Sequence, residues 1–229
     1  MAKLHAGMVE HETCFFAYEQ TQGRGQRGKK WLSSPGENIT MSTLFEPTHR
    51  LSANVTALPF LLSAAMALGC YDFIKDYGIP DISIKWPNDL YSGDRKAAGI
   101  LIDNIYKGTS WEWSVVGTGI NINQEGFPGD LKKAVSFKML TGTHYNTVKL
   151  GKKLFGYLLN RFELLKHSTA AKIMEEYNSV LYKRKEEIKF KKDTILFTAR
   201  ISHANQYGQL IITGEAGEQA FGVGEVEFI

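Results

Sequence analysis

Three strand-like runs follow one another between residues 81 and 122 and are separated only by short turns. Residues 81–86 alternate isoleucine with polar side chains, while residues 96–106 and 111–122 are rich in apolar and β-branched residues. Both patterns are typical of strands. Short turns join antiparallel neighbours, because a parallel pair needs a crossover of about a dozen residues or more. The runs therefore predict an antiparallel meander and exclude a chain built from βαβ units.

A further strand and several helices are expected around this meander. Residues 38–45 alternate like a strand, and residues 51–77 carry apolar side chains at helical spacing. Pro59 does not suit a helix interior, so it either kinks this helix or marks its first turn. Residues 146–165 predict an amphipathic helix, and Ser168 is the expected N-cap of a last helix. The sequence predicts an α+β fold with a mainly antiparallel sheet.

The composition changes near the charged run at residues 183–187. Such runs are usually solvated linkers or helix ends, and short β-rich segments separated by glycine-containing turns follow it. We therefore predict a main domain over residues 1–185 and a small barrel-like β-domain over residues 186–229. A unit of about 40 residues buries too little surface to be robust alone, so we expect it to pack on the main domain.

Composition excludes several classes of protein. A formal net charge of +3 is too small to indicate a nucleic-acid partner by itself. Cys14 and Cys70 have no metal-ligand spacing, which favours a reducing, cytoplasmic setting. No apolar run reaches the ~18 residues of a membrane helix. Residues 1–7 lack the core of a signal peptide and read as the last turns of a helix, so the chain as given starts inside an element.

The first candidate functional segment is residues 23–31, with the sequence GRGQRGKKW. Glycine lets a backbone approach a ligand closely, and arginine presents a planar fork to carboxylate or phosphate oxygens. The segment therefore predicts a loop that closes over an anionic, partly planar ligand. The alternatives are a solvated basic turn and an RGG-like nucleic-acid segment. The glycine spacing fits neither a phosphate loop nor a dinucleotide fingerprint.

The same loop is expected to be mobile without its ligand. Ordering its nine residues costs roughly 10 kcal/mol or more of conformational free energy. The segment contains no Asp or Glu that would pair with its cations. We therefore expect it to order when an anion binds, which hydrogen exchange with and without ligand tests.

The second candidate segment is Lys85-Trp86-Pro87-Asn88-Asp89, at the end of the first strand of the meander. Pro87 keeps Trp86 extended. Asn88 and Asp89 then turn the chain and present polar groups to a site. The simpler interpretation is an Asx turn that terminates the strand.

Lys96 begins the returning strand after a hairpin turn at residues 92–94. On a period of two, Lys96 shares its face with Ala98 and Ile100, while Gly99 lies on the opposite face and leaves room for close approach. A lysine at the end of an apolar face is either an edge residue that reaches water or a partly desolvated cation aimed at a ligand.

The third candidate segment, Gly117-Thr118-Gly119-Ile120-Asn121, ends the last strand of the meander. Its two glycines would allow a flat or phosphate-bearing group to lie close to the backbone. Glycines at strand ends also mark β-bulges, so this segment alone leaves both interpretations open.

Taken together and in order, these segments resemble the biotin protein ligase family. The family's glycine–arginine loop matches residues 23–31, and its lysine–tryptophan–proline–asparagine–aspartate motif matches residues 85–89. Its lysine before a Gly-Ile-Leu strand matches Lys96, and its glycine–x–glycine–isoleucine–asparagine strand matches residues 117–121. The resemblance implies the fold of class II aminoacyl-tRNA synthetases and biotin synthetases, followed by a small SH3-like β-barrel.

The resemblance also implies a two-step reaction. Biotin and Mg²⁺-ATP form biotinyl-5′-AMP and pyrophosphate, and a lysine of biotin carboxyl carrier protein, a subunit of acetyl-CoA carboxylase, then takes the biotinyl group. Lys96 and Arg24 would be catalytic. The implied biotin-binding residues are Gln20, Arg24, Gly25, Gln26, Trp31, Lys96 and Gly99. The implied ATP- and adenylate-binding residues are Arg24, Arg27, Lys85, Asn88, Asp89 and Asn121. No metal ligands are assigned.

The chain departs from the family pattern in three places. Gln26 stands where many members carry a second arginine, which would weaken retention of the adenylate. The family's Ser-Thr-Asn segment would lie upstream of Met1, so we expect the first strand of the catalytic domain to be missing. No helix-turn-helix domain precedes the catalytic part, so DNA binding is not expected.

Two other functions stay open from the sequence. One is a binding protein for biotin or an acyl-adenylate with impaired turnover, and the other is a lipoate-type acyl ligase. Release of pyrophosphate separates the first from an active ligase, and a panel of substrates separates the second. Edge strands of the predicted sheet would allow either a homodimer or docking of the carrier protein.

Overall fold

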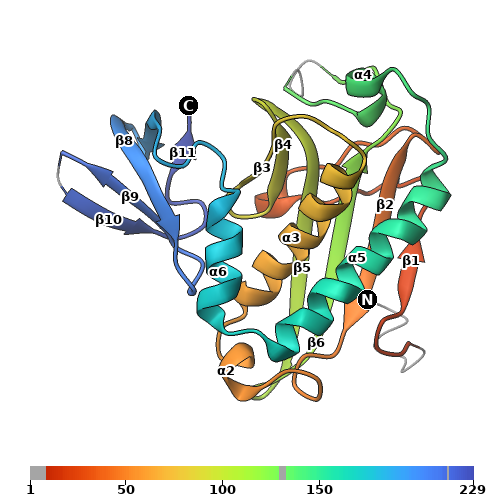
Figure 1. The fold of residues 1–229 in the computed structure, drawn as a ribbon, viewed down its shortest axis with the longest axis horizontal. Coiled ribbons are helices and arrows are strands. Elements are labelled where there is room, and N and C mark those ends of the chain that lie inside the picture. The colour runs from red at the N-terminus through yellow and green to blue at the C-terminus, as the bar shows by residue number, and fades with distance from the viewer. Residues whose placement is uncertain (1–8, 129–132, 216) are drawn as a thin grey trace.

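The computed structural model describes residues 9–128, 133–215 and 217–229 (Figure 1). The helix end expected within residues 1–7 lies outside the described residues. Six strands form the central sheet: β1 (Cys14–Phe16), β2 (Asn38–Phe45), β3 (Ile82–Lys85), β4 (Asp89–Ser92), β5 (Arg95–Lys107) and β6 (Ser110–Asn121). Their order is β1-β2-β6-β5-β4-β3, and every neighbouring pair is antiparallel. The predicted meander is confirmed, with β4 as an additional strand.

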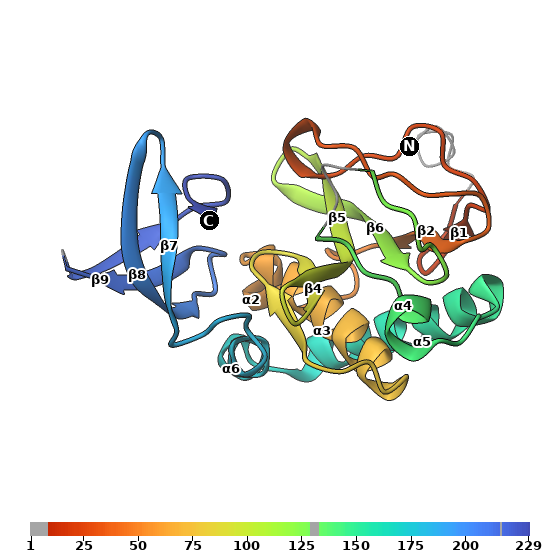
Figure 2. The same cartoon turned by 90° about the horizontal axis from the view of Figure 1, so that it is seen from above.

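Helices cover one face of this sheet (Figure 2). They are α2 (Ala53–Thr56), α3 (Phe60–Asp76), α4 (Phe137–Thr141), α5 (Thr147–His167) and α6 (Ala170–Ser179). Leu150, Leu154 and Leu158 recur every fourth residue of α5 and are buried, as an amphipathic helix requires. Gly69 lets α3 approach α5 closely, because a Cβ there would lie 3.2 Å from Leu158 Cδ2.

Two helix boundaries differ from the sequence-based expectation. The single helix predicted over residues 51–77 is divided into α2 and α3, and Pro59 is the N-cap of α3 rather than a kink. A proline is tolerated at a helix start because the N–H that it lacks has no helical partner there. The prediction of Ser168 as an N-cap is also wrong. Thr169 is the N-cap of α6, and its side chain accepts a hydrogen bond from the Lys172 N–H.

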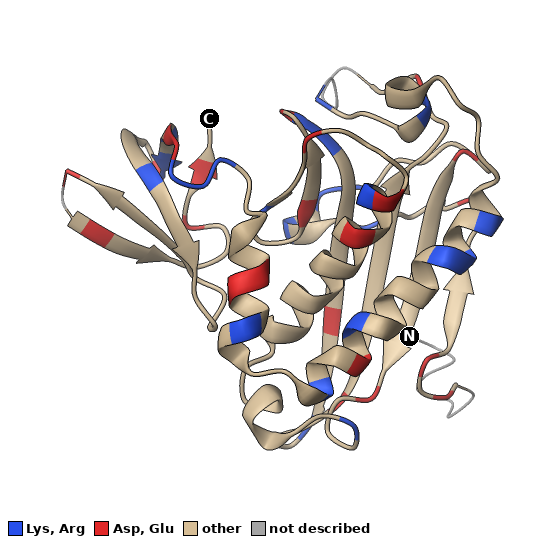
Figure 3. Ribbon diagram, viewed as in Figure 1, with Lys and Arg blue, Asp and Glu red and all other residues tan. Residues whose placement is uncertain are grey.

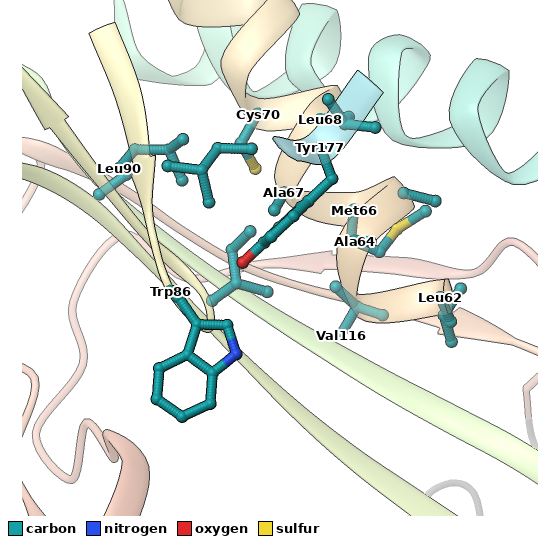
Figure 4. Close-up of a cluster of buried hydrophobic side chains, with 14 of the residues drawn as sticks. Leu62, Ala64, Met66, Ala67, Leu68, Cys70, Trp86, Leu90, Val116 and Tyr177 are labelled. Carbon is teal, nitrogen blue, oxygen red and sulfur yellow. The ribbon is translucent and has the colours of Figure 1, made fainter. Parts of the chain in front are cut away.

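The core between α3 and the sheet extends to the Lys85-Trp86 motif (Figure 4). Tyr177 of α6 is completely buried and reaches toward Trp86, which is 5% exposed. The Tyr177 hydroxyl donates to the Pro87 carbonyl oxygen at 2.9 Å, so its polar end is satisfied. The turn that follows β3 is therefore held from inside the core.

A second sheet of five antiparallel strands lies beside α6 (Figure 1). It contains β7 (Glu187–Lys192), β8 (Ile195–Ala204), β9 (Leu210–Gly214), β10 (Gly217–Phe221) and β11 (Glu227–Phe228), in the order β10-β9-β8-β7-β11. Within the described residues, no pairing between β10 and β11 closes this sheet into the expected barrel.

Buried hydrogen bonds join the second sheet to the rest of the chain. The Asn178 side chain of α6 donates to Ala204 O at 2.9 Å and accepts from Ala204 N at 2.7 Å. The Trp86 indole N–H donates to Gly208 O at 3.1 Å. Across the described ranges, no helix is long and apolar enough to cross a membrane.

Candidate active site

The glycine–arginine loop, residues 23–31, forms a narrow turn closed by its own backbone. Gly25 N–H donates to Lys29 O at 2.7 Å, and Trp31 N–H donates to Gly23 O at 3.0 Å. At its tip is a 3₁₀ turn, η1 (Gln26–Gly28), in which Arg27 has a φ of 56°. Gly23 is required here, because a Cβ would lie 2.2 Å from Trp31 O.

This loop lies on the face of the sheet opposite the helices (Figure 2). The Trp31 indole covers Gly119 of β6 so closely that a Cβ on Gly119 would lie 2.4 Å from Trp31 Cε2. Arg24 reaches Asp103 of β5 at 3.5 Å, but their side chains are 73% and 43% exposed, so this pair stabilises the loop little. The expected mobility of the loop without ligand stays a prediction.

A row of four small residues, two of them glycines, crosses the sheet beneath the loop. Asp89 of β4, Gly99 of β5, Gly119 of β6 and Thr40 of β2 are successive cross-strand partners, so they share one face. The two central positions lack a side chain, and the Trp31 indole lies directly over Gly119. The missing Cβ atoms at Gly99 and Gly119 therefore let flat or charged groups lie close to the sheet.

Lys96 and Asp89 meet at one end of this row. Lys96 Nζ lies 2.7 Å from Asp89 Oδ2, with the side chains 33% and 27% exposed. A Cβ on Gly99 would lie 3.2 Å from both Lys96 Nζ and Asp89 Oδ1. The ion pair is partly desolvated and lies beside the Gly99 backbone.

This arrangement corrects the predicted face of Lys96. Simple alternation places Gly99 on the opposite face, yet a β-bulge shifts the register between β4 and β5 at Leu90 and Tyr91. Ala97 is the unpaired extra residue, and both Ala97 and Ala98 are completely buried. One extra residue reverses the alternation beyond it. Lys96 therefore points to the same side as Gly99.

Lys85 lies in a cage of three aromatic rings. Its Nζ is 4.8 Å from the ring centre of Tyr91, 5.7 Å from that of Tyr182 and 4.8 Å from that of Phe228. It also donates to the Tyr91 hydroxyl at 3.4 Å. Burial lowers the pKa of Lys85, while the nearby Asp89 carboxylate opposes this shift.

Asn88 and Asn121 use their amide nitrogens to hold backbone. The Asn88 side chain donates to Ile100 O of β5. Asn121 is buried and donates to Lys96 O at 3.3 Å and Val135 O at 3.2 Å. Both residues thus fix the segments that carry the Lys96–Asp89 pair.

Comparison with known proteins decides the family. The sequence profile of the biotin/lipoate A/B protein ligase family matches residues 3–121, just over half of the 229 residues. The chain belongs to the biotin/lipoate A/B protein ligase family.

Curated relatives of this ligase-family chain are similar over part of their length. The bifunctional ligase/repressor BirA of Escherichia coli K12 is 36% identical over 111 residues, which are 48% of this chain and 33% of that protein. The biotin--[acetyl-CoA-carboxylase] ligase of Paracoccus denitrificans is 33% identical over 108 residues, 46% of this chain and 42% of that protein. The chain therefore spans less than half the length of these relatives.

Solved structures of the family resemble the chain over nearly all of it. The biotin protein ligase from Aquifex aeolicus in complex with biotin and ATP has a TM-score of 0.76 and 26% identity, and the match covers 96% of this chain and 90% of that one. The biotin protein ligase from Leishmania major has a TM-score of 0.62 and 19% identity, with 96% and 92% covered, so it supports the fold alone. The predicted fold class is confirmed.

The structure also adds residues to this ligase-family site that the sequence patterns do not identify. Asp103, Tyr177, Tyr182 and Phe228 contact Arg24, Pro87 and Lys85 from distant parts of the chain. Such contacts have no local sequence signal. The implied biotin-contacting residue Gln20 lies at the base of the loop, with Oε1 3.1 Å from where a Gly23 Cβ would stand.

No cluster of three or more His, Cys, Asp or Glu residues suited to a metal ion occurs in the described part of this family member. Two surface hollows, one between α3, α5 and α6 and one between α6 and the β8–β9 turn, lie away from Lys96. The candidate site is therefore an open sheet face covered by a loop.

Proposed function

We propose that the chain activates biotin with Mg²⁺-ATP to biotinyl-5′-AMP and transfers the biotinyl group to a lysine of a carrier protein. Family membership supports this, as does the similarity to a structure described as a complex with biotin and ATP. The names of the curated relatives also point to biotin ligation.

The single observation that carries the proposal is the Lys96–Asp89 pair beside Gly99. Both chemical steps develop negative charge on phosphate or acyl oxygens, and fixed cations lower the cost of that charge. A unit charge pair at 4 Å is worth about 1 kcal/mol in water but roughly 4 kcal/mol at an effective dielectric near 20. The Trp31 indole covers the sheet at Gly119.

The chain's residues act in two steps. In the first, a biotin carboxylate oxygen attacks the α-phosphorus, the bond to pyrophosphate breaks, and Lys96 stabilises the charge on the phosphate and acyl oxygens. In the second, the neutral amine of the carrier lysine attacks the acyl carbon, the bond to AMP breaks, and the proton that the nitrogen loses passes to water. Arg24 and Arg27 are the loop cations offered to the adenylate, and a closed loop protects the mixed anhydride from hydrolysis.

Magnesium enters this scheme as part of the substrate Mg²⁺-ATP. Mg²⁺ prefers oxygen ligands and is often held by one or two carboxylates together with substrate phosphates. Asp89, the carboxylate that is ion-paired with Lys96, fits that ligand type. It would hold the metal only by exchanging its contact with the lysine.

We propose that the acceptor is the biotin carboxyl carrier protein of acetyl-CoA carboxylase. The name of the Paracoccus denitrificans relative, a biotin--[acetyl-CoA-carboxylase] ligase, supports this choice. The edges of the central sheet, β1 and β3, are where either a carrier or a second copy would add strand pairing.

The proposal is tested by biotin-dependent exchange between ATP and pyrophosphate, followed by transfer of labelled biotin to a carrier domain. Lys96→Ala should lower the exchange rate roughly 100-fold, the usual loss for one electrostatic stabiliser. Lys166→Ala is the matched control, because Lys166 is also ion-paired, to Glu163 on α5. Unchanged exchange in Lys96→Ala would refute the assignment of Lys96.

The same assay separates the competing functions. Tight biotin binding without exchange would indicate a binding protein. Faster exchange with lipoate or octanoate would indicate the lipoate side of the family, which the matching profile also covers.

A further inference from the structure

The last strand of the chain reaches the cations of two different motifs. Phe228 of β11 stacks against Lys85 Nζ at 4.8 Å. Four residues earlier, Gly224 lies under the guanidinium of Arg27, so closely that a Cβ on Gly224 would be 2.5 Å from Arg27 Cζ. Both cations precede the second sheet in the chain, whereas Phe228 lies in β11 of that sheet and Gly224 lies in the turn between β10 and β11.

Lys85 is linked to the reacting pair through the sheet. It is the cross-strand partner of Asp89 at the end of the β3–β4 hairpin, and Asp89 is the partner of Lys96. Charges on neighbouring strands act at short range in a partly desolvated site. The position of the Lys85 ammonium therefore affects the Asp89 carboxylate, and through it Lys96.

We propose that β11 and the turn before it position the active-site cations, Phe228 through Lys85 and the Gly224 backbone through Arg27. This inference rests on the proposed ligase function. Phe228 and Gly224 are positioning residues, since they touch the two cations rather than substrate. Through them, the second sheet sets where both motif cations point.

The aromatic cage explains how a cation remains at this junction. Burial lowers the pKa of Lys85 most, the Asp89 carboxylate opposes this shift, and the charges of Lys133, Lys96 and Lys183 lower the pKa further. Figure 3 shows basic residues in the segment that joins α6 to β7. Ring faces attract an ammonium without a hydrogen bond to each ring, so three rings hold Lys85 where water is partly excluded.

The first test replaces the ring and compares matched variants. Phe228→Leu removes a ring from the cage, and Phe228→Tyr keeps it. Phe197→Leu is the control, because both Phe197 and Phe228 pack on Phe190, with centroids 5.7 and 5.2 Å away. Of these two rings, only Phe228 is among the described contacts of Lys85. We expect Phe228→Leu to raise the KM for ATP roughly three- to tenfold, with Phe228→Tyr and Phe197→Leu close to wild type.

A second readout does not depend on activity. Trace acetylation followed by mass spectrometry measures the reactivity of Lys85 relative to Lys166. We expect Lys85 to react several-fold faster in Phe228→Leu and at the wild-type rate in Phe197→Leu. Equal Lys85 reactivity in both variants, or loss of folding in Phe228→Leu but not in Phe197→Leu, would overturn the role of Phe228.

The second test concerns the turn. Gly224→Ala and Gly217→Ala impose similar backbone strain, since the two φ angles are 86° and 87°. A Cβ on Gly224 would collide with the Arg27 side chain, whereas a Cβ on Gly217 would meet nothing within 4 Å. We expect Gly224→Ala to raise the KM for ATP and to speed hydrogen exchange in residues 23–31, with neither effect in Gly217→Ala. Identical exchange in the two variants would contradict the contact's role.

Failure of the ligase proposal can be told apart from failure of the positioning role of Phe228 and Gly224. If the wild-type chain catalyses no exchange with any acyl substrate, the ligase proposal fails. The acetylation and hydrogen-exchange results would still decide whether the second sheet holds the two cations.

Discussion

A missing Cβ at Gly119 decides where the glycine–arginine loop can lie. The indole of Trp31 rests on this position, 2.4 Å from where a Cβ would stand. No rotamer change at residue 119 relieves such an overlap, because a Cβ is fixed to the backbone. The fit between Gly119 and Trp31 is a residue-scale condition for closing the loop.

We therefore expect Gly119→Ala to displace the loop. Trp31 fluorescence should shift to longer wavelength, and exchange activity should fall at least tenfold, as expected when reacting groups move by about 1 Å. Gly117→Ala is the control on the same strand, since its Cβ would lie 3.3 Å from the Leu101 O. The Trp31→Phe variant shows which part of the fluorescence spectrum comes from Trp31. Equal spectra for Gly119→Ala and Gly117→Ala would contradict the prediction.

Gln26 offers a second residue-scale test. It lies in η1, next to Arg27, and a neutral amide there attracts an adenylate phosphate less than an arginine would. Gln26→Arg should slow release of the acyl-adenylate several-fold, whereas Gln26→Met should not. Chasing bound, labelled adenylate with unlabelled biotin and ATP measures this rate, and equal release from all three chains would exclude an effect of charge.

At the scale of elements, the turn between β3 and β4 connects three parts of the molecule. The Trp86 indole N–H donates a hydrogen bond to Gly208 O in the turn between β8 and β9. The Pro87 carbonyl accepts one from the Tyr177 hydroxyl of α6. The Asn88 side chain donates a hydrogen bond to Ile100 O of β5, and Asp89 forms an ion pair with Lys96. The motif that the sequence suggests as a ligand site is thus also a structural junction.

Helix α5 provides a matched test of packing against β1. Gly156 is exposed, and a Cβ there would meet nothing within 4 Å, whereas a Cβ on Gly151 would lie 2.8 Å from the Phe16 ring. Gly156→Ala should stabilise the protein by roughly 0.5–1 kcal/mol, the usual gain in a helix. Gly151→Ala should destabilise it, because Phe16 must move. Urea unfolding measures both, and equal midpoints would contradict the described packing.

At the scale of the molecule, the two sheets are joined by buried polar contacts as well as by apolar packing. Asn178 is 8% exposed and makes two hydrogen bonds with Ala204 across the junction. A buried group that loses its partner costs about 1–3 kcal/mol, and more when it is charged. The junction should therefore make the two sheets unfold together.

Asn178→Asp tests this coupling, because it replaces the donor to Ala204 O with a carboxylate oxygen. We expect a loss of about 3 kcal/mol and separate transitions for the two sheets. Asn205→Asp is the control, because its side chain bonds only within the β8–β9 turn among the described contacts. Circular dichroism and tryptophan fluorescence during heating should diverge in the first variant and coincide in the second.

The antiparallel meander, helix α5 and the three motifs could all be predicted from the order of residues along the chain. These features depend on local periodicity, turn residues and short spacings, which are all readable along the chain. Family resemblance extended the same motifs to a fold and a reaction. The motifs and the family resemblance together identified four candidates for one site: Arg24, Trp31, Lys85 and Lys96.

How these candidate residues face one another depends on the folded arrangement of the strands. A β-bulge at Ala97 moved Lys96 to the side of Gly99, and no pattern in the sequence marks the extra residue. Phe228 reached Lys85 from 143 positions further along the chain. Contacts of this kind depend on register and on the packing of distant elements, because a side chain's direction is set by its partner strands as well as by its own sequence.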